Sequence, residues 1–145
     1  MLSLNRVDTS LKVFIGLRRT NDMLDKLIHK DIKSYGLNVT EFAVLEVLYN
    51  RGEHTIQRIK ERILIASSST TYVVTNLEKK GYIQRRQDTK DKRVSYASLT
   101  DKGRAFMDEI FPNHANAIAS VFSDLSEDEL QSLQKVLKRI STQSE

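Results

Sequence analysis

Apolar residues recur at helical spacing through most of this chain. From about Asp8 to Lys33 they return every three, four or seven positions, which predicts one helix of about 25 residues ending at Gly36 as a left-handed cap. Such a helix, roughly 37 Å long at 1.5 Å per residue, is long for a single small domain. We therefore expect a second chain to cover part of its apolar stripe, formed by Leu11, Phe14, Leu17, Leu24, Leu27, Ile28 and Ile32.

Two shorter helices follow. Asn38 and Glu41 have the spacing of a capping box before an apolar run that ends near Asn50. Thr55 caps a third helix in which isoleucines alternate with basic residues, so the isoleucines should face inward. A tight turn through residues 64–66 then leads to the next helix. Two short helices joined by a few residues are typical of a helix-turn-helix, whose second helix enters the major groove.

The second of these helices begins in a run of hydroxyl residues and ends at Gly81. Thr70, Val73, Val74 and Leu77 share one face and should pack on the core. One serine is expected to cap the helix, but a four-residue Ser/Thr run is a poor helix interior and favours contact roles. Hydroxyl and amide groups bond base edges and phosphates. The candidate DNA contacts are Ser67, Ser68, Ser69, Thr71, Tyr72, Thr75 and Asn76.

A basic hairpin follows Gly81. Residues 82–86 and 93–99 alternate like strands, and residues 88–91 form the tip. A cationic tip of this kind fits a narrow minor groove, where the negative potential is enhanced. Asp88 and Asp91 are expected to shape the turn, with Asp91 pairing with Arg93. The candidate DNA contacts of the hairpin are Arg85, Arg86, Lys90, Lys92 and Arg93.

The C-terminal third returns to helical periodicity. Thr100 caps a helix that contains Pro112, and because the residue before proline avoids helical geometry we expect a kink or break near Phe111. Ser126 and Glu129 have capping-box spacing before a final helix. The apolar faces of these helices need partners, and the first helix is the obvious one, within a chain and across a dimer. The final stripe consists of Leu130, Leu133, Val136, Leu137 and Ile140.

Composition and charge narrow the class of protein. The 145 residues suit one domain, and no apolar run approaches the roughly 18 residues that span a membrane. The polar N-terminus predicts no signal peptide, so we expect a cytoplasmic protein. The segment from Arg51 to Arg104 holds 13 Lys/Arg against 6 Asp/Glu, while the remainder carries a net charge of −3. This distribution fits either a phosphate-facing surface or an ordinary solvated face.

Enzymatic and metal chemistry find little support. The chain contains no cysteine, and its histidines, at 29, 54 and 114, are widely separated, without catalytic partners or a paired ligand spacing. We therefore expect no enzyme and no cofactor, although a metal-responsive variant stays open. Lone histidines on helices are usually capping or surface residues. The aromatic residues Phe14, Tyr35, Tyr49 and Phe106 are candidates for a ligand pocket, but aromatic residues at helical spacing more often belong to the core.

Nearly the whole chain resembles the MarR family of winged helix-turn-helix transcription regulators. The resemblance rests on FAVLEVL, on STTYVVTNLEKKGYI and above all on DTKDKRVSYASLTDKG, in which the family's wing pattern falls on Asp88, Asp91, Arg93, Leu99, Thr100 and Gly103. It implies a mainly α fold with a small β-hairpin wing. Residues 38–100 would be the DNA-binding lobe, and residues 1–37 and 101–145 the dimerisation helices.

The resemblance also implies a function. A homodimer, in many members a repressor, would bind a pseudopalindromic site on double-stranded DNA and be released by a small aromatic ligand. Three positions depart from the family: Leu64 replaces a common glycine, Tyr72 a frequent basic residue, and Pro112 lies inside the usual long fifth helix. Thiol oxidation is excluded without cysteine. A winged-helix protein that binds DNA without sensing a ligand, or one that binds proteins instead, remains an alternative.

Overall fold

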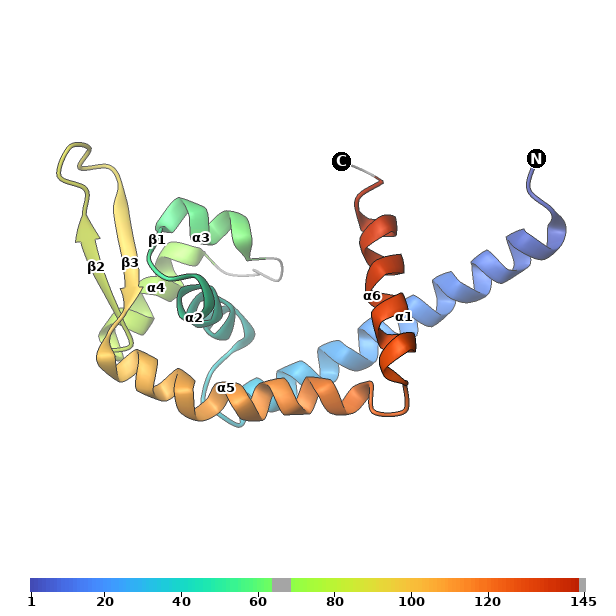
Figure 1. Cartoon of the computed structure of the whole chain (residues 1–145). Helices are drawn as coiled ribbons and strands as arrows, with labels where there is room; N and C mark the ends of the chain where they lie inside the picture. Colours follow the sequence, from blue (N-terminus) through green and yellow to red (C-terminus); the bar gives the residue numbers. More distant parts are fainter. Residues whose placement is uncertain (64–68, 144–145) are drawn as a thin grey trace.

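The computed structural model describes residues 1–63 and 69–143. The predicted turn at 64–66, including Leu64, and the candidate contacts Ser67 and Ser68 lie outside these residues. The described chain is mainly helical with a small antiparallel sheet, as predicted (Figure 1). Its elements are α1 (Leu4–Lys33), α2 (Val39–Arg51), β1 (His54–Thr55), α3 (Ile56–Arg62), α4 (Thr70–Lys79), β2 (Ile83–Gln87), β3 (Ser95–Leu99), α5 (Asp101–Val121) and α6 (Glu127–Ser141).

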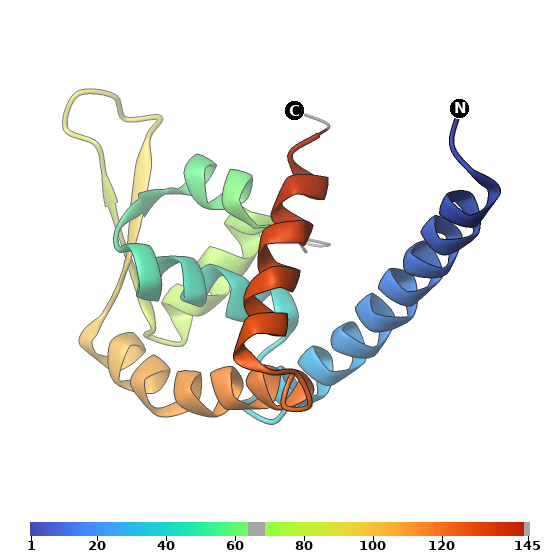
Figure 2. The ribbon, with the colours of Figure 1, turned by 45° about the vertical axis from the view of Figure 1, so that its right-hand side comes forward.

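The elements form a lobe, and the helices α1 and α6 extend outside it (Figure 1). α2, α3, α4 and the sheet gather at one end, and α5 runs from that lobe toward the base of α6 (Figure 1). α1 extends away from the lobe, and α1 and α6 diverge from each other in the turned view (Figure 2). No helix among the described residues is long and apolar enough to cross a membrane.

The sheet has the strand order β1-β3-β2, with both pairings antiparallel. β1 was not predicted, because two residues carry no alternation that a pattern could reveal; His54 pairs with Ala97 and Thr55 with Tyr96. The second hairpin strand is shorter at the tip end than predicted, since β3 begins at Ser95 rather than Arg93, whereas β2 ends at Gln87, one residue beyond its predicted end. The loop of residues 88–94 therefore projects beyond the sheet (Figure 1).

The core lies inside the lobe, and each lobe helix contributes one face. On α4 the residues predicted to face inward are all buried, which confirms that the helix is amphipathic; they are Thr70, Val73, Val74 and Leu77. This face packs against α2, while the sheet adds Ile83 and Ala97 to the same core. Burial of such apolar side chains at about 1.5–3 kcal/mol each fixes the orientation of α4 on the lobe.

The predicted helix ends follow local capping chemistry. The Asn38 side chain accepts from the Glu41 N–H at 2.8 Å, and Ser126 accepts from the Glu129 N–H at 3.1 Å; both capping boxes are complete. Gly36 has φ +78°, the left-handed value predicted for the cap after α1. These caps involve only residues close together in the sequence, so they can be predicted from the sequence before any tertiary contact is known.

Two expectations about the helices were wrong. α1 begins at Leu4 rather than near Asp8, because Ser3 caps it by accepting from the Arg6 N–H at 3.1 Å. Of the kink or break expected near Phe111, the break does not occur: α5 is one helix with Pro112 inside. The Pro112 ring is exposed, so the Asp108 carbonyl that lacks its helical donor lies where water can reach it. Met107, Ile110 and His114 are buried on the opposite face and hold both halves against the lobe.

Candidate nucleic-acid interface

The outward face of α4 carries small polar groups and one large ring. Ser69, Thr71 and Tyr72 are exposed, and Tyr72 keeps 65% of its surface accessible, a high value for an aromatic residue. Thr75 and Asn76 are half-buried one turn further on. The buried residues Val73 and Leu77 anchor the helix, so this polar face is held out from the lobe as the sequence predicts.

The wing tip is shaped by two aspartates. The Asp88 carboxylate accepts from the backbone N–H groups of Lys90 at 3.2 Å and Asp91 at 2.9 Å. Asp91 accepts from the Arg93 N–H at 3.0 Å and from its guanidinium at 3.0 and 3.1 Å. The Arg93 side chain nevertheless stays 91% exposed. The predicted Asp91–Arg93 pair is therefore present, and it presents the guanidinium to solvent in a fixed direction.

Ionisation at the tip follows from that pair. The side-chain hydrogen bond from Arg93 lowers the pKa of Asp91, and the same bond raises the pKa of Arg93. Both groups are consequently charged at neutral pH. Lys90 and Lys92 make no ion pair in the part of the chain that the structure describes, which leaves their charge free on the surface of the tip.

The other two wing arginines are engaged within the protein. Arg85 donates to Thr75 Oγ1 at 2.9 Å and to Glu78 Oε1 at 3.2 Å. Arg86 donates to both carboxylate oxygens of Glu53, at 3.2 and 2.7 Å, and its guanidinium lies 4.1 Å from the centroid of the Tyr96 ring. Sequence reasoning placed both arginines on the DNA. In the structure each has an acidic partner within the protein, Glu78 for Arg85 and Glu53 for Arg86.

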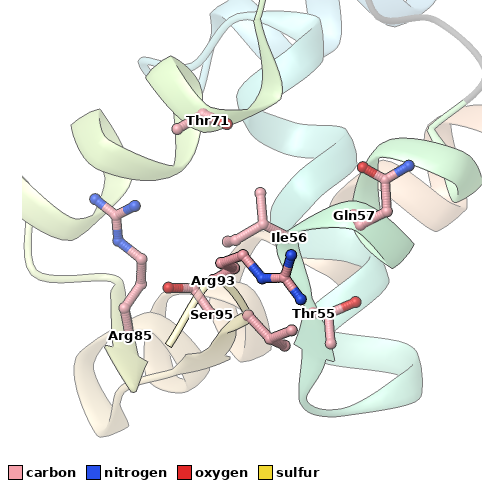
Figure 3. A pocket seen from close by; sticks show the side chains of 8 residues that line it. Thr55, Ile56, Gln57, Thr71, Arg85, Arg93 and Ser95 are labelled. Atoms are coloured by element: carbon pink, nitrogen blue, oxygen red, sulfur yellow. The ribbon is translucent and has the colours of Figure 1, made fainter. Parts of the chain in front are cut away.

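A hollow of about 420 Å³ lies between the first turn of α4, the start of α3 and the wing. Figure 3 shows Arg85, Thr71, Arg93 and Gln57 around it. Residues with guanidinium, hydroxyl and amide groups, from three parts of the lobe, thus line one concave surface. The residues that line it are Thr55, Ile56, Gln57, Thr71, Arg85, Arg93, Val94 and Ser95.

Five of these lining residues were missed by sequence reasoning. Thr55 was assigned only to a helix cap and Ile56 only to the inward face of its helix, while Gln57, Val94 and Ser95 were assigned to no site. The cap itself exists, since Thr55 accepts from the Arg58 N–H at 3.1 Å. Because β1 pairs with β3, the start of α3 lies beside the wing. A two-residue strand has no sequence pattern from which this pairing could be predicted.

A buried polar cluster lies where α1, α2 and α5 meet. His114 Nδ1 lies 2.8 Å from Asp31 Oδ2, and His114 Nε2 lies 3.8 Å from Glu46 Oε2. Tyr35 donates to the other Asp31 oxygen at 2.7 Å, while Phe42 packs 4.4 Å from the His114 ring. Burial, with the Asp31 carboxylate beside it, raises the pKa of Tyr35 to about 12. The expectation that the histidines are capping or surface residues was therefore wrong for His114, which is 5% exposed.

The four aromatic candidates for a ligand pocket are not brought together. Phe14 borders an apolar groove of about 670 Å³ between α1, α6 and the end of α5. Tyr35 lies in the polar cluster, and Tyr49 donates to Asp108 and packs 5.5 Å from Phe111. Phe106 stacks on Tyr82, with the ring centroids 4.6 Å apart. Each ring thus has a separate environment within the described residues. The same residues contain no group of three or more His, Cys, Asp or Glu side chains placed so that they could hold a metal ion.

Comparison with known proteins agrees with this geometry. The model of the MarR family matches residues 37–95, which include α2–α4 and the first strand of the wing. The chain is 44% identical to the helix-turn-helix transcriptional regulator MhqR of Bacillus subtilis, over 92% of each protein. It is 49% identical to the regulator YkoM of the same organism, over 80% of this chain and 75% of YkoM.

A solved structure shares the fold. The crystal structure of Sco3205, a MarR family regulator from Streptomyces coelicolor in complex with DNA, superimposes with a TM-score of 0.81 at 21% identity. The alignment covers 97% of this chain and 88% of that one. At this identity the similarity concerns the fold, including the helices that flank the lobe.

Proposed function

This chain belongs to the MarR family of transcription regulators, and we propose that it acts in the cytoplasm as a homodimeric repressor on a pseudopalindromic operator. One observation supports this most directly. Thr71, on the polar face of α4, and the exposed Arg93 border the same concave hollow. A groove reader needs a projecting helix and a flanking cation on one side of the lobe, and this surface provides both.

Within the proposal, α4 enters the major groove. The Thr71 and Asn76 groups offer donors and acceptors to base edges, while the exposed Tyr72 ring offers apolar area to thymine methyl groups. The wing tip follows the backbone into the adjacent minor groove, where Arg93 is the leading residue. The remaining proposed contacts are Ser67, Ser68 and Ser69 on the α4 side and Lys90 and Lys92 on the wing.

The proposed dimer forms through residues 1–37 and 101–145, with residues 38–100 as the DNA-binding lobe. α1 leaves Leu11 and Phe14 more than half exposed, and every residue of α6 is at least partly exposed. Such an accumulation of apolar surface is unfavourable in water and indicates an interaction site. A second copy would cover these faces and set the distance between the two lobes, which must match successive major grooves.

Release by a small aromatic ligand is part of the proposal. Phe14 is 52% exposed at the edge of the 670 Å³ groove, which lies on the surface assigned to dimerisation. A ligand there would act by favouring one spacing of the lobes over another, because only a difference in affinity between two states shifts their populations. If no aromatic compound changes DNA affinity, the protein is a DNA-binding member without ligand sensing.

The proposed DNA binding is tested by selection from random-sequence duplexes, followed by fluorescence anisotropy on the recovered duplex at several salt concentrations. The log–log salt slope should be about −0.9 for each phosphate contacted. Arg93→Gln should reduce the magnitude of the slope by about 0.9, the value for one phosphate contact, whereas Asn76→Ala should weaken the preference for the selected sequence with little change in slope. Equal binding to selected and random duplexes at moderate salt would contradict the proposal.

The dimer is tested separately by light scattering at micromolar concentration. Leu137 lies on the α6 stripe and borders the apolar groove, so Leu137→Lys should yield monomers by burying a charge at the interface. Lys135→Ala, an exposed position on the same helix, is the matched control and should stay dimeric. A monomeric wild type would refute the dimer.

A further inference from the structure

Arg85 points from the wing toward the recognition helix. On β2 the side chains alternate between the two faces of the sheet, so Arg85 shares its face with Ile83, which is 2% exposed in the core. The Arg85 side chain is accordingly only 26% exposed. Arg86, the next residue, points to the opposite face, where it meets Glu53. Two neighbouring arginines of one basic hairpin therefore have different surroundings.

The contacts of Arg85 occupy groups on α4 that would otherwise face solvent. Thr75 Oγ1 accepts from Arg85 at 2.9 Å and donates its only proton to the Thr71 carbonyl at 2.9 Å. The hydroxyl thus has no proton left to offer a base or a phosphate. Glu78 lies one turn later on the same helix, and its carboxylate receives the second Arg85 bond at 3.2 Å. The guanidinium neutralises an acidic group that would repel a phosphate backbone.

We infer that Arg85, Thr75 and Glu78 form a clasp that positions the recognition helix against the wing. Arg85 is then a positioning residue for DNA reading and not a phosphate contact, and Thr75 is its acceptor and not a base reader. The clasp makes α4 and the hairpin approach DNA as one unit, with the angle between them set before binding. This inference rests on the proposed DNA-binding function.

The planar guanidinium of arginine suits this role. Both bonds leave its Nη2 atom, whose two N–H groups lie in the plane of a rigid group and reach two acceptors about one helical turn apart, which restrains the distance and the rotation of α4 relative to β2. Lysine at this position would keep the charge, but its ammonium rotates freely on a flexible stem and would hold the two acceptors less rigidly. The clasp therefore predicts a difference between Arg85→Lys and the wild type in sequence preference, with no difference in overall charge.

The experiment compares affinity for two duplexes of equal length, one recovered by selection with the wild-type protein and one of random sequence. Binding is measured by anisotropy over a range of salt for Arg85→Met, Thr75→Val and the double variant. Arg86→Met is the matched control, because it removes one positive charge at the adjacent residue without touching α4. Thermal unfolding of each variant is recorded, and Arg85→Lys, alone and combined with Thr75→Val, takes the place of Arg85→Met if that variant fails to fold.

The clasp predicts a specific pattern. Arg85→Met should lower the preference for the selected duplex on the order of tenfold, and Thr75→Val on the order of threefold, as expected for charge-assisted bonds at a partly exposed site. The double variant should lose no more than Arg85→Met alone, because both substitutions remove the same contact. Arg85→Lys should lie between Arg85→Met and the wild type. The salt slope of Arg85→Met should equal that of the wild type, and Arg86→Met should keep the preference.

Three results overturn the clasp while leaving the proposed function intact. A salt slope reduced by about 0.9 in Arg85→Met would make Arg85 a phosphate contact. Losses of Thr75→Val and Arg85→Met that multiply in the double variant would make Thr75 an independent reader. An unchanged preference in Arg85→Met would show that the contact does not position α4 for reading. A wild type that does not distinguish the two duplexes overturns both the function and the clasp.

Discussion

Gly103 lies at the closest approach between α5 and the base of the wing, and replacing it with alanine should destabilise the protein. It is buried in the first turn of α5, where its N–H donates to the Thr100 hydroxyl at 3.0 Å. A Cβ at this position would lie 2.1 Å from the Tyr82 carbonyl oxygen and 2.9 Å from its carbon. Both atoms belong to backbone, so no side-chain rotation can relieve the overlap.

The size of the effect follows from what must move. Restoring ordinary contact requires a shift of α5 by roughly 1 Å, since dispersion contacts between heavy atoms are optimal near 3.5–4 Å. That shift stretches the bond from the Thr100 N–H to the Tyr82 carbonyl, now 3.0 Å, and the Tyr82–Phe106 stack, now 4.6 Å. Overpacking of this kind costs about 1–3 kcal/mol, and each weakened contact adds about 1 kcal/mol. Alanine recovers about 1 kcal/mol of helix propensity, which leaves a net loss of roughly 2–4 kcal/mol.

The assay is urea unfolding followed by the helical circular dichroism signal, at one fixed protomer concentration because an oligomer's stability depends on it. Ala105→Gly is the matched control, since Ala105 is exposed on the same helix and should lose only about 1 kcal/mol of propensity. If propensity alone governed both positions, the two substitutions would have opposite signs. Tight packing at Gly103 predicts that both destabilise, and that Gly103→Ala destabilises more.

In thermal unfolding the same loss should lower the midpoint of Gly103→Ala by roughly 4–16 °C, at about 2–4 °C for each kcal/mol in a protein of this size. A Gly103→Ala protein that is as stable as the wild type, or more stable, would refute the close approach of α5 to Tyr82.

Three further predictions concern the same framework. The pKa of Tyr35 is raised to about 12 in the folded protein, so the stability that Tyr35 contributes is complete below its ordinary pKa of 10.0 and is lost as the pH rises through about 12. Ultraviolet titration should show a tyrosine that ionises at higher pH than the others. Tyr35→Phe should remove this ionisation, and Asp31→Asn should shift it to lower pH. Lys80→Met should lower the free energy of unfolding in urea by about 1 kcal/mol, because the Glu41 carboxylate, whose side chain is 9% exposed, loses its partner at 2.7 Å. In a protein that already carries Glu41→Gln, Lys80→Met should cause no such loss. Pro112→Ala should raise stability by roughly 1–3 kcal/mol, since α5 already runs through this position; a loss of stability would mean that the proline shapes the helix.

The sequence by itself determined most of the elements and several of their ends. The capping boxes at Asn38 and Ser126, the glycine turn at Gly36 and the Asp91–Arg93 pair all join residues at most four positions apart. Contacts of that range form from local conformation, so a pattern of residue types is enough to predict them. The amphipathic face of α4 was equally readable, because burial follows helical spacing.

The tertiary structure decided what the charged side chains do. Arg85 and Arg93 look alike in a basic hairpin, yet one faces the acidic side of α4 and the other projects from the tip; strand alternation and the register with β3 separate them. His114 meets Asp31 across 83 positions of sequence, a pairing that exists only once α1 and α5 cross. Packing on both sides of Pro112 likewise overrode the local preference to end the helix. Local rules place residues on a face, whereas the fold determines which other face they meet.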